Sequence, residues 1–355
     1  MSERKHNFNA GPAALPLPVL EQVQRELCDY RGSGMSVMEM SHRTDVYEEI
    51  LFRARDTIAR LYGLPDTHEV LFLQGGASLQ FAMVPMNLGT GGAYVDTGTW
   101  SSKAISEAKL LGPVHRLWTG ADEHYRRVPK EGELAEAPED APYLHYTSNN
   151  TIYGTQFHYV PRSTVPLVAD LSSDFLSRPL DVRPFDLIYA GAQKNAGPSG
   201  VVVVIARKTI SRGYRGLAST PKILRYVTQA ENDSMYNTPN TFGIYVLGLV
   251  AEWVEQTGGL AAMAEINAEK ARRLYETIDE DPRFEGHATE DSRSHMNVTW
   301  RMGDAAHEKT LLAAAEAAGI VGLKGHRSVG GLRASIYNAV PLASVDALIK
   351  LLRSH

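Results

Sequence analysis

The segment Leu187-Ile-Tyr-Ala-Gly-Ala-Gln-Lys194-Asn-Ala-Gly-Pro-Ser-Gly200-Val-Val-Val-Val-Ile205 constrains the fold most strongly. An apolar run leads into Lys194, a turn rich in glycine, proline and serine follows, and a second apolar run begins at Val201. Runs that are apolar on consecutive residues are typical of strands covered on both faces. A lysine between two such strands can have its amine partly desolvated, which lowers its pKa, as an imine-forming amine requires. A solvent-exposed lysine beside a turn is the ordinary alternative.

An earlier apolar run, Val165-Pro-Leu-Val-Ala-Asp170, ends in an aspartate one predicted strand before Lys194. Pyridoxal 5′-phosphate (PLP) needs a carboxylate beside its pyridine nitrogen. The carboxyl ends of parallel strands are also where α/β sheets bind ligands. Asp170 alone could equally cap a helix or a turn. Together, Asp170 and Lys194 favour a PLP site in which Lys194 is the catalytic, Schiff-base lysine.

Two further turns could complete such a site. Gly75-Gly76-Ala77-Ser78 follows a strand-like run and precedes a helical pattern, so its N–H groups and the Ser78 hydroxyl could hold a phosphate. A Gly-Gly turn by itself is common. Trp100 follows the strand-like run at Ala93–Val95 and could stack on a flat ring. Packing in the core is an equally good reading of that tryptophan.

Three cationic segments suggest an anionic substrate. They are His42-Arg43, His326-Arg327 and Arg333, and each lies near glycine or serine. The planar fork of arginine suits carboxylates and phosphates. The set therefore resembles a receptor for a substrate with more than one anionic group, although unrelated surface charges would look the same in a sequence.

Composition narrows the class of protein. The chain has 355 residues, 43% of them hydrophobic, and a net charge of −5. It can bury a large core without disulfides, and its acidity disfavours binding to nucleic acid or to a membrane surface. The single cysteine, Cys28, excludes an internal disulfide and a cysteine-rich zinc site, and its helical surroundings predict a buried thiol. No apolar run approaches the length of a signal core or a membrane span, so we expect a cytoplasmic enzyme.

The order of predicted elements indicates an α/β fold with a large and a smaller domain. Helical patterns at Val46–Leu61 and Ser101–Leu111 alternate with strand-like runs, which favours a mainly parallel sheet. The expected strands are Glu69–Leu73, Ala93–Val95, Tyr143–Tyr146, Leu167–Ala169, Leu187–Tyr189 and Val201–Ile205. After Gly258-Gly259 come a helix, a strand, a helix, a strand and a helix, expected at Leu260–Ile278, Met296–Trp300, Ala305–Ala318, Gly331–Tyr337 and Leu342–Leu352. We expect a large PLP-binding domain at 16–258 and a small domain made of 1–15 and 259–355.

From about residue 6 to the C-terminus the chain resembles the phosphoserine aminotransferase family. The motifs that carry the resemblance are Phe8-Asn-Ala-Gly-Pro-Ala13, Ser36-Val-Met-Glu-Met-Ser-His-Arg43, Tyr189-Ala-Gly-Ala-Gln-Lys-Asn195, Asn237-Thr-Pro and Gly325-His-Arg-Ser-Val-Gly-Gly-Leu-Arg-Ala-Ser-Ile-Tyr-Asn338. The Lys194 segment and the last segment are specific to that family.

This resemblance implies the PLP-dependent transferase fold of type I, with a mainly parallel seven-stranded sheet. It also implies a homodimer with two active sites at the subunit interface. Lys194 would carry PLP and Asp170 would pair with its pyridine nitrogen. The other implied cofactor-binding residues are Trp100 on the ring, Thr151 on the phenolic side, Gln193, Gly76, Ala77 and Ser78 at the phosphate, and Asn237 and Thr238 from the partner subunit. Some members have Gly-Arg where this chain has Ala77-Ser78, so one phosphate-side charge is missing here.

The resemblance also implies the substrates and the reaction. Arg333 would bind the substrate α-carboxylate. His42, Arg43, His326 and Arg327 would receive the substrate phosphate or the glutamate side-chain carboxylate. The reaction would be 3-phosphohydroxypyruvate and L-glutamate giving O-phospho-L-serine and 2-oxoglutarate, by ping-pong kinetics, in serine biosynthesis.

Three other functions compete with this one. Alanine–glyoxylate and serine–pyruvate aminotransferases handle small uncharged side chains and would not need two His-Arg pairs. A cysteine desulfurase needs a mobile catalytic cysteine, whereas Cys28 lies in a helical pattern. A non-catalytic PLP-binding protein is disfavoured by the intact pair of Asp170 and Lys194.

Overall fold

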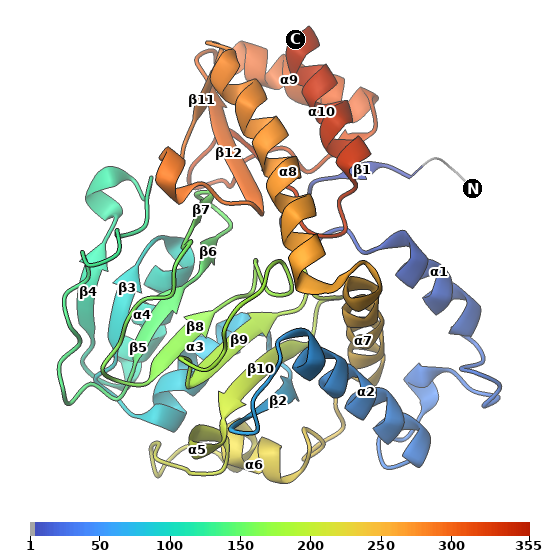
Figure 1. Cartoon of the computed structure of the whole chain (residues 1–355), viewed down its shortest axis with the longest axis vertical. Helices are drawn as coiled ribbons and strands as arrows, with labels where there is room; N and C mark the ends of the chain where they lie inside the picture. The colour runs from blue at the N-terminus through green and yellow to red at the C-terminus, as the bar shows by residue number, and fades with distance from the viewer. Residues whose placement is uncertain (1–3) are drawn as a thin grey trace.

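The computed structural model describes residues 4–355 and contains a seven-stranded sheet with helices on both faces and a smaller three-stranded sheet near the C-terminus (Figure 1). The first part of the chain forms β1 (His6–Asn7), α1 (Leu17–Glu26), α2 (Asp45–Leu61), β2 (His68–Leu73), α3 (Gly76–Leu88), β3 (Ala93–Asp96), α4 (Thr99–Leu111), β4 (His115–Thr119), β5 (Leu144–Thr147), β6 (Asn149–Asn150), β7 (Thr155–Gln156), β8 (Leu167–Asp170), β9 (Leu187–Gly191) and β10 (Val202–Arg207). The second part forms α5 (Lys208–Ser211), α6 (Tyr226–Glu231), α7 (Thr241–Gln256), α8 (Gly259–Glu280), β11 (Phe284–Gly286), β12 (Asn297–Met302), α9 (Ala305–Ala317), β13 (Ile320–Val321), β14 (Leu332–Ser335) and α10 (Leu342–Ser354).

The large sheet has the strand order β2-β10-β9-β8-β5-β3-β4. Strand β10 is antiparallel to both of its neighbours, and the remaining pairs are parallel. The expected mainly parallel seven-stranded sheet is therefore confirmed. Because β5, β8 and β9 run in the same direction, the residues that follow them emerge at one edge of the sheet, which is the usual ligand-binding edge.

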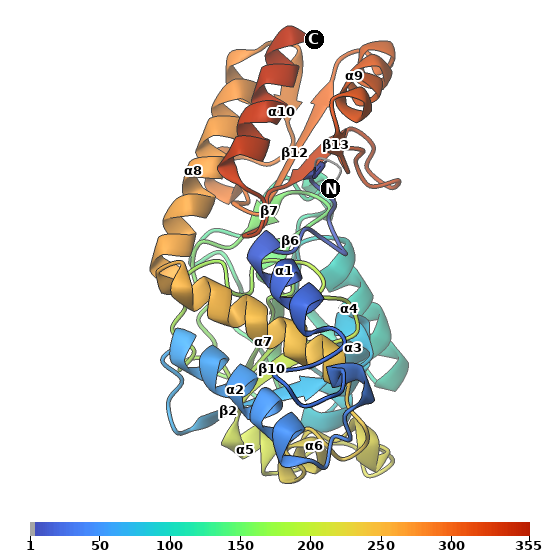
Figure 2. The ribbon, with the colours of Figure 1, turned by 90° about the vertical axis from the view of Figure 1, so that its right-hand side faces the viewer.

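Burial on both faces explains the continuous apolar strands. In β10, Val203 and Ile205 belong to one hydrophobic cluster, whereas Val202 and Val204 belong to another. Successive side chains of a strand point to opposite faces, so a strand between two helical layers must be apolar throughout. Helices α2 and α7 cover one face and pack against each other, as Figure 2 shows. Helices α3 and α4 cover the other.

Strand β4 was not among the strands expected from the sequence. It lies at the edge of the large sheet, and its first residues, His115 and Arg116, are exposed. An edge strand needs no continuous apolar run, so its pattern is weaker than that of the central strands.

The C-terminal elements have a core of their own. Strands β11, β12 and β14 form an antiparallel sheet, and its core includes Trp300 and Leu348. Phe8 belongs to the same core, and β1 pairs with β13 in parallel. On these contacts we propose two domains, 16–258 and the combination of 1–15 with 259–355. Residues 1–3 lie outside the described residues.

The prediction for Cys28 was wrong. Helix α1 ends at Glu26, and Cys28 lies in the bend after it with its thiol exposed. The apolar spacing that suggested a buried position continues past the end of the helix, so it does not mark one face there. Along residues 4–355, no helix is both long and apolar enough to span a membrane.

Candidate active site

Lys194 follows β9 and lies at the edge of the large sheet where segments distant in sequence meet. Its Nζ atom donates to Thr151 Oγ1 at 2.5 Å and lies 5.0 Å from the centroid of the Trp100 ring. The N-terminal segment is equally close, since a Cβ on Gly11 would lie 3.3 Å from Lys194 Cγ. The fold thus brings together the expected Schiff-base lysine, Thr151 and Trp100.

The surroundings of Lys194 favour a reactive amine. Burial lowers the pKa of Lys194 from its usual value of 10.5 to about 8. The positive charge of Arg333 lowers the pKa further, whereas the carboxylates of Asp170 and Asp174 oppose the shift. A substantial fraction of the amine is therefore neutral near physiological pH, and the neutral form is the nucleophile.

Asp170 ends β8 and is 4% exposed. Its Oδ1 atom accepts from the Ser172 N–H at 2.9 Å and from the Ser172 hydroxyl at 2.6 Å. Burial raises the pKa of Asp170, while the Ser172 hydrogen bonds and the charge of Lys194 lower it. Within residues 4–355, no hydrogen bond reaches its Oδ2 atom. A buried carboxylate with one free oxygen fits a protonated ring nitrogen.

The start of α3 is shaped for an anion. Gly75 has φ +87°, and a Cβ there would lie 2.4 Å from Leu79 Cδ2, so only glycine fits. No side chain of the described residues caps this helix, which leaves the first N–H groups, at Gly76, Ala77 and Ser78, free for a phosphate. This is the arrangement that the sequence predicted, and the exposed hydroxyl of Ser78 adds a further donor.

Asn237 and Thr238 lie near this helix start within the same chain. Gln74 donates to the Thr238 carbonyl at 3.1 Å, and Asn237 lines a cavity together with Gly75. Both residues are exposed. Their expected contact with the phosphate site of a partner subunit stays a prediction.

The cations that the sequence predicted separate into two groups. Arg333, on β14, donates to the Thr151 carbonyl at 3.4 Å, and burial lowers its pKa. Burial also lowers the pKa of His326, and the nearby charges of Arg333, Arg327 and Lys103 lower it further. Arg333, His326 and Arg327 therefore belong to one electropositive region, and the charge of Arg333 reaches Lys194.

His42 and Arg43 form the second group. They lie in the loop before α2, and no contact within residues 4–355 joins either of them to Lys194. Gln193 is the immediate neighbour of Lys194, and its carbonyl accepts from the N–H of Ala13 at 2.9 Å. A single chain thus brings Thr151, Trp100, Asp170 and Arg333 to Lys194, and the roles predicted for the remaining residues stay predictions.

Two residues near the site were missed from the sequence. Lys103 lies on α4 with its Nζ 4.8 Å from the Trp100 ring centroid. Its position three residues after Trp100 on a predicted helix could have revealed it, because residues three apart share a helix face. Tyr337 is fully buried, and its hydroxyl group donates to the Ala10 carbonyl at 2.9 Å. The Tyr337 side chain also hydrogen-bonds with that of Thr151. Only the packing of the two domains brings it there.

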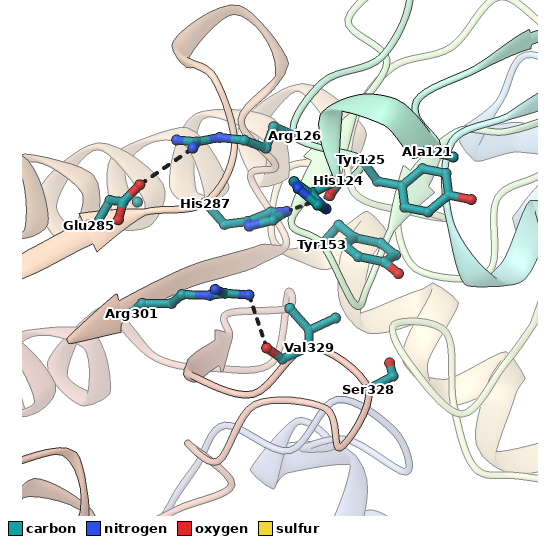
Figure 3. A pocket seen from close by; sticks show the side chains of 11 residues that line it. Ala121, His124, Tyr125, Arg126, Tyr153, Glu285, His287, Arg301, Ser328 and Val329 are labelled. Atoms are coloured by element: carbon teal, nitrogen blue, oxygen red, sulfur yellow. Dashed lines mark hydrogen bonds and ion pairs between the residues drawn. The ribbon is translucent and has the colours of Figure 1, made fainter. Parts of the chain in front are cut away.

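A cavity of about 330 Å³ lies beside the site, between the two proposed domains (Figure 3). It is lined partly by Ser328 and Val329, which follow the predicted anion-binding pair. Three of its polar side chains already have partners. Arg126 pairs with Glu285 at 3.4 Å, Arg301 donates to the Val329 carbonyl at 3.1 Å, and His287, whose pKa is lowered by burial, donates to the His124 carbonyl at 3.1 Å. We assign the chemistry to the Lys194 region instead.

Comparisons with known proteins agree with this site. A family model described as aminotransferase class-V matches residues 5–348. A phosphoserine aminotransferase of Lysinibacillus sphaericus is 54% identical and aligns over 98% of this chain and 97% of its own length. The solved phosphoserine aminotransferase from Bacillus circulans subsp. alkalophilus is 50% identical, with a TM-score of 0.96 over 99% of this chain and 98% of that one. The PLP-bound phosphoserine aminotransferase from Trichomonas vaginalis is 38% identical, with a TM-score of 0.94 over 99% and 100%. These similarities confirm the expected fold.

Proposed function

This chain belongs to the class-V aminotransferases and, within them, to the phosphoserine aminotransferases, and from that premise we propose how its residues carry out the reaction. The enzyme transfers the amino group of L-glutamate to 3-phosphohydroxypyruvate, reversibly, giving O-phospho-L-serine and 2-oxoglutarate. PLP is its cofactor. Membership of this family sets aside the alanine–glyoxylate, serine–pyruvate and desulfurase alternatives. The argument from a helical Cys28 against a desulfurase does not hold, because Cys28 lies in the bend beyond the end of α1.

The residues present fit the cofactor. The free Oδ2 of Asp170 would pair with the pyridine nitrogen, the uncapped start of α3 would hold the phosphate, and Trp100 would cover the ring. Thr151 would contact the phenolic oxygen and Gln193 would line the phosphate side. PLP, when bound, withdraws electrons from the substrate α-carbon and so makes its proton acidic.

Lys194 and Arg333 act on different groups of the substrate. Arg333 binds the α-carboxylate, which glutamate and the phosphorylated keto acid both present. Lys194 Nζ takes the proton from the substrate α-carbon as general base, since its lowered pKa leaves a substantial fraction of the amine neutral. The observation that carries this assignment is that both side chains meet at Thr151, Lys194 at the hydroxyl and Arg333 at the carbonyl.

The second anionic group of each substrate would lie toward His326, Arg327 and Lys103. His42 and Arg43 would complete this receptor from the partner subunit, since one chain does not bring them to Lys194. Large exposed apolar side chains flank that pair, at Met35, Met38 and Val46. Exposed apolar groups gathered around a functional loop favour an interface. These features support a homodimer.

We also propose that the enzyme acts in the cytoplasm. Its exposed, unpaired Cys28 thiol is compatible with a compartment that keeps thiols reduced. Fractionation of cells, followed by immunodetection of the enzyme, tests this location.

The choice of substrate is tested by comparing amino donors. We expect the purified holoenzyme to convert O-phospho-L-serine far faster than L-alanine, because only the former fills the second anion site. We expect Arg333→Ala to reduce kcat/KM for amino donor and keto acceptor alike, by roughly 100-fold, since a charged hydrogen-bonded pair is lost. Arg162→Ala, at a side chain that is 93% exposed, is the control. A loss confined to one of the two substrates would contradict the role of Arg333.

A further inference from the structure

Two of the sequence motifs end in asparagines, Asn195 and Asn338, that the proposed mechanism does not use. The structure joins them, because the Asn338 N–H donates to Asn195 Oδ1 at 2.9 Å. Asn195 is 7% exposed and follows Lys194 directly, and Asn338 is 5% exposed and lies three residues after β14. A hydrogen bond between buried groups thus links the lysine loop of the large domain to the strand that carries Arg333.

A third asparagine, Asn267 on α8, extends this link. It is 1% exposed, and its Nδ2 atom donates to Asn338 Oδ1 at 2.8 Å. We call Asn195, Asn267 and Asn338 the asparagine triad. All three contact residues 175–177, which lie in the turn that follows β8 and Asp170.

The triad binds three consecutive carbonyls of that turn. Asn195 donates to the carbonyl of Phe175 at 2.7 Å, Asn338 to that of Leu176 at 2.7 Å, and Asn267 to that of Ser177 at 3.2 Å. Leu176 has φ +62°, a left-handed conformation that costs a non-glycine residue about 1 kcal/mol or more. The surrounding bonds hold the turn in this shape.

Lys270, one helical turn after Asn267 on α8, binds the segment that contains Asn338. It is fully buried, and its Nζ atom donates to the carbonyls of Ile336, Tyr337 and Val340 at 2.9, 2.7 and 3.2 Å. An ammonium group has three donors, so this arrangement uses all of them. Helix α8 therefore fixes residues 336–340, the direct continuation of the Arg333 strand.

We propose that the asparagine triad sets the position of Arg333 relative to Lys194. Its members are positioning residues, because they act through the two side chains that contact the substrate. The bonds converge on the three segments that carry Lys194, Arg333 and Asp170, and they cross the boundary between the two proposed domains. This inference rests on the roles proposed above for Lys194 and Arg333.

If the triad had a purely structural role, its loss would lower stability without changing the site. A matched control variant distinguishes this structural role from a positioning role. Asn87 is also a buried asparagine, 6% exposed, and it makes three hydrogen bonds, with Met83, Leu224 and Tyr226, inside the large domain. Asn338→Ala and Asn87→Ala should each lower the melting temperature of the holoenzyme, because each leaves buried groups unpaired. Only Asn338→Ala should change the site.

For Asn338→Ala we expect kcat/KM to fall by roughly 10- to 100-fold for both substrates, as small displacements of reacting groups do. We also expect the pH midpoint of the visible absorbance of the holoenzyme to move upward. The charge of Arg333 helps to keep the lysine nitrogen unprotonated, and that influence weakens if Arg333 moves away. If Asn338→Ala alters neither kcat/KM nor the midpoint, or if Asn87→Ala alters both equally, the triad has no positioning role.

Asn267→Ala provides a second variant if Asn338→Ala does not fold. It removes the bonds from Asn267 to Asn338 and Ser177 but leaves the bond from Asn338 to the Leu176 carbonyl in place, so we expect smaller changes of the same sign. Arg333→Ala separates this inference from the proposed function. If Arg333→Ala lowers kcat/KM for both substrates and both triad variants leave kcat/KM unchanged, only the triad inference is wrong. If Arg333→Ala leaves both substrates unchanged, the proposed role of Arg333 itself fails.

Discussion

At the scale of single residues, the environment of Lys194 explains its chemistry better than its neighbours in the sequence do. The amine is surrounded by groups from four separate segments, namely Gly11, Trp100, Thr151 and Arg333. Their combined effect is to exclude water and to add a positive charge, and both lower the pKa of Lys194. Asp170 opposes them, so the site holds its lysine between the charged and neutral forms.

We predict that Lys194 of the apoenzyme reacts with a limiting amount of acylating reagent along a pH curve centred at about 8. The exposed lysines of the same protein, labelled in the same experiment, provide the reference curve. Asp170→Asn removes a negative charge that raises the pKa of Lys194, so its midpoint should move to lower pH. Mass spectrometry of the labelled peptides measures both curves. Asp181→Asn, at an exposed carboxylate paired with Arg183, is the control. A Lys194 curve that coincides with those of surface lysines contradicts the assignment.

At the scale of elements, the first turn of α4 depends on one buried serine. The Ser101 hydroxyl donates to Asp96 at 3.1 Å and accepts from the N–H groups of Thr97 and Gly98 at 2.9 and 3.0 Å. Asp96 also accepts from Ser102 at 2.8 Å. These bonds fix the start of the helix on the end of β3 and thereby the direction of Trp100.

We predict that Ser101→Ala weakens both folding and cofactor binding. It leaves two N–H groups without their partner at a fully buried site, which costs about 1–3 kcal/mol for each unpaired group. Displacement of Trp100 should also raise the Kd for PLP, measured by titrating apoenzyme and following absorbance. Ser106→Ala on the same helix is the matched control, since its exposed hydroxyl bonds only the Ser102 carbonyl. Equal effects of the two substitutions would show that Ser101 has no special role.

Helix α8 carries a second testable feature, the buried ammonium of Lys270. Burial lowers the pKa of Lys270 to about 7, so the unfolded chain binds more protons than the native chain above that pH. Stability should therefore rise with pH from about 7 to 10, by at most ~1.4 kcal/mol per pH unit for this group.

We predict that Lys270→Met removes this contribution. The difference in melting temperature between wild type and the variant should grow between pH 7 and 9, as followed by calorimetry of the holoenzyme. Lys350→Met, at an exposed position of α10, should show no such trend. A difference that stays constant with pH would mean that Lys270 does not titrate in this range.

At the scale of the whole molecule, we propose that the site is shared between the two proposed domains and between two subunits. Asp170 ends β8, Lys194 follows β9 and Trp100 lies on α4, whereas Arg333 lies on β14 and the His326-Arg327 pair precedes that strand. Along residues 4–355, no contact joins His42 or Arg43 to Lys194. The receptor for the second anionic group would therefore be complete only in a dimer.

We predict that two inactive variants complement each other. Lys194→Ala and Arg43→Ala should each have low activity alone. When they are co-expressed and allowed to mix, half of the dimers carry one subunit of each kind, and one of their two sites is intact. The mixture should regain about a quarter of the wild-type rate per subunit. An absence of recovery, with mixed dimers verified by two affinity tags, would place Arg43 in the site of its own chain.

Much of this protein is determined by its sequence alone. The apolar runs around Lys194 and Asp170 predict central strands, because a strand buried on both faces must be apolar at every position. The order of strands and helices predicts the mainly parallel sheet, and that sheet places the residues after β5, β8 and β9 at one edge. The sequence therefore predicts Lys194 and Asp170 at that edge, and the family resemblance adds Trp100 and Arg333.

Only the tertiary structure decided the rest, because burial and hydrogen bonding depend on which distant segments meet. Cys28 is exposed although its spacing is helical, β4 is a strand without an apolar run, and Lys103 reaches the site without any motif. Tyr337 lies in a quoted motif, but only the packing brings its side chain to the site. The asparagine triad is the clearest case. Its members are separated by up to 143 residues, and no local pattern indicates that they bond to one another. By our proposal, the packing of α8 and of the segment after β14 against the turn after β8 thus sets the position of Lys194 relative to Arg333.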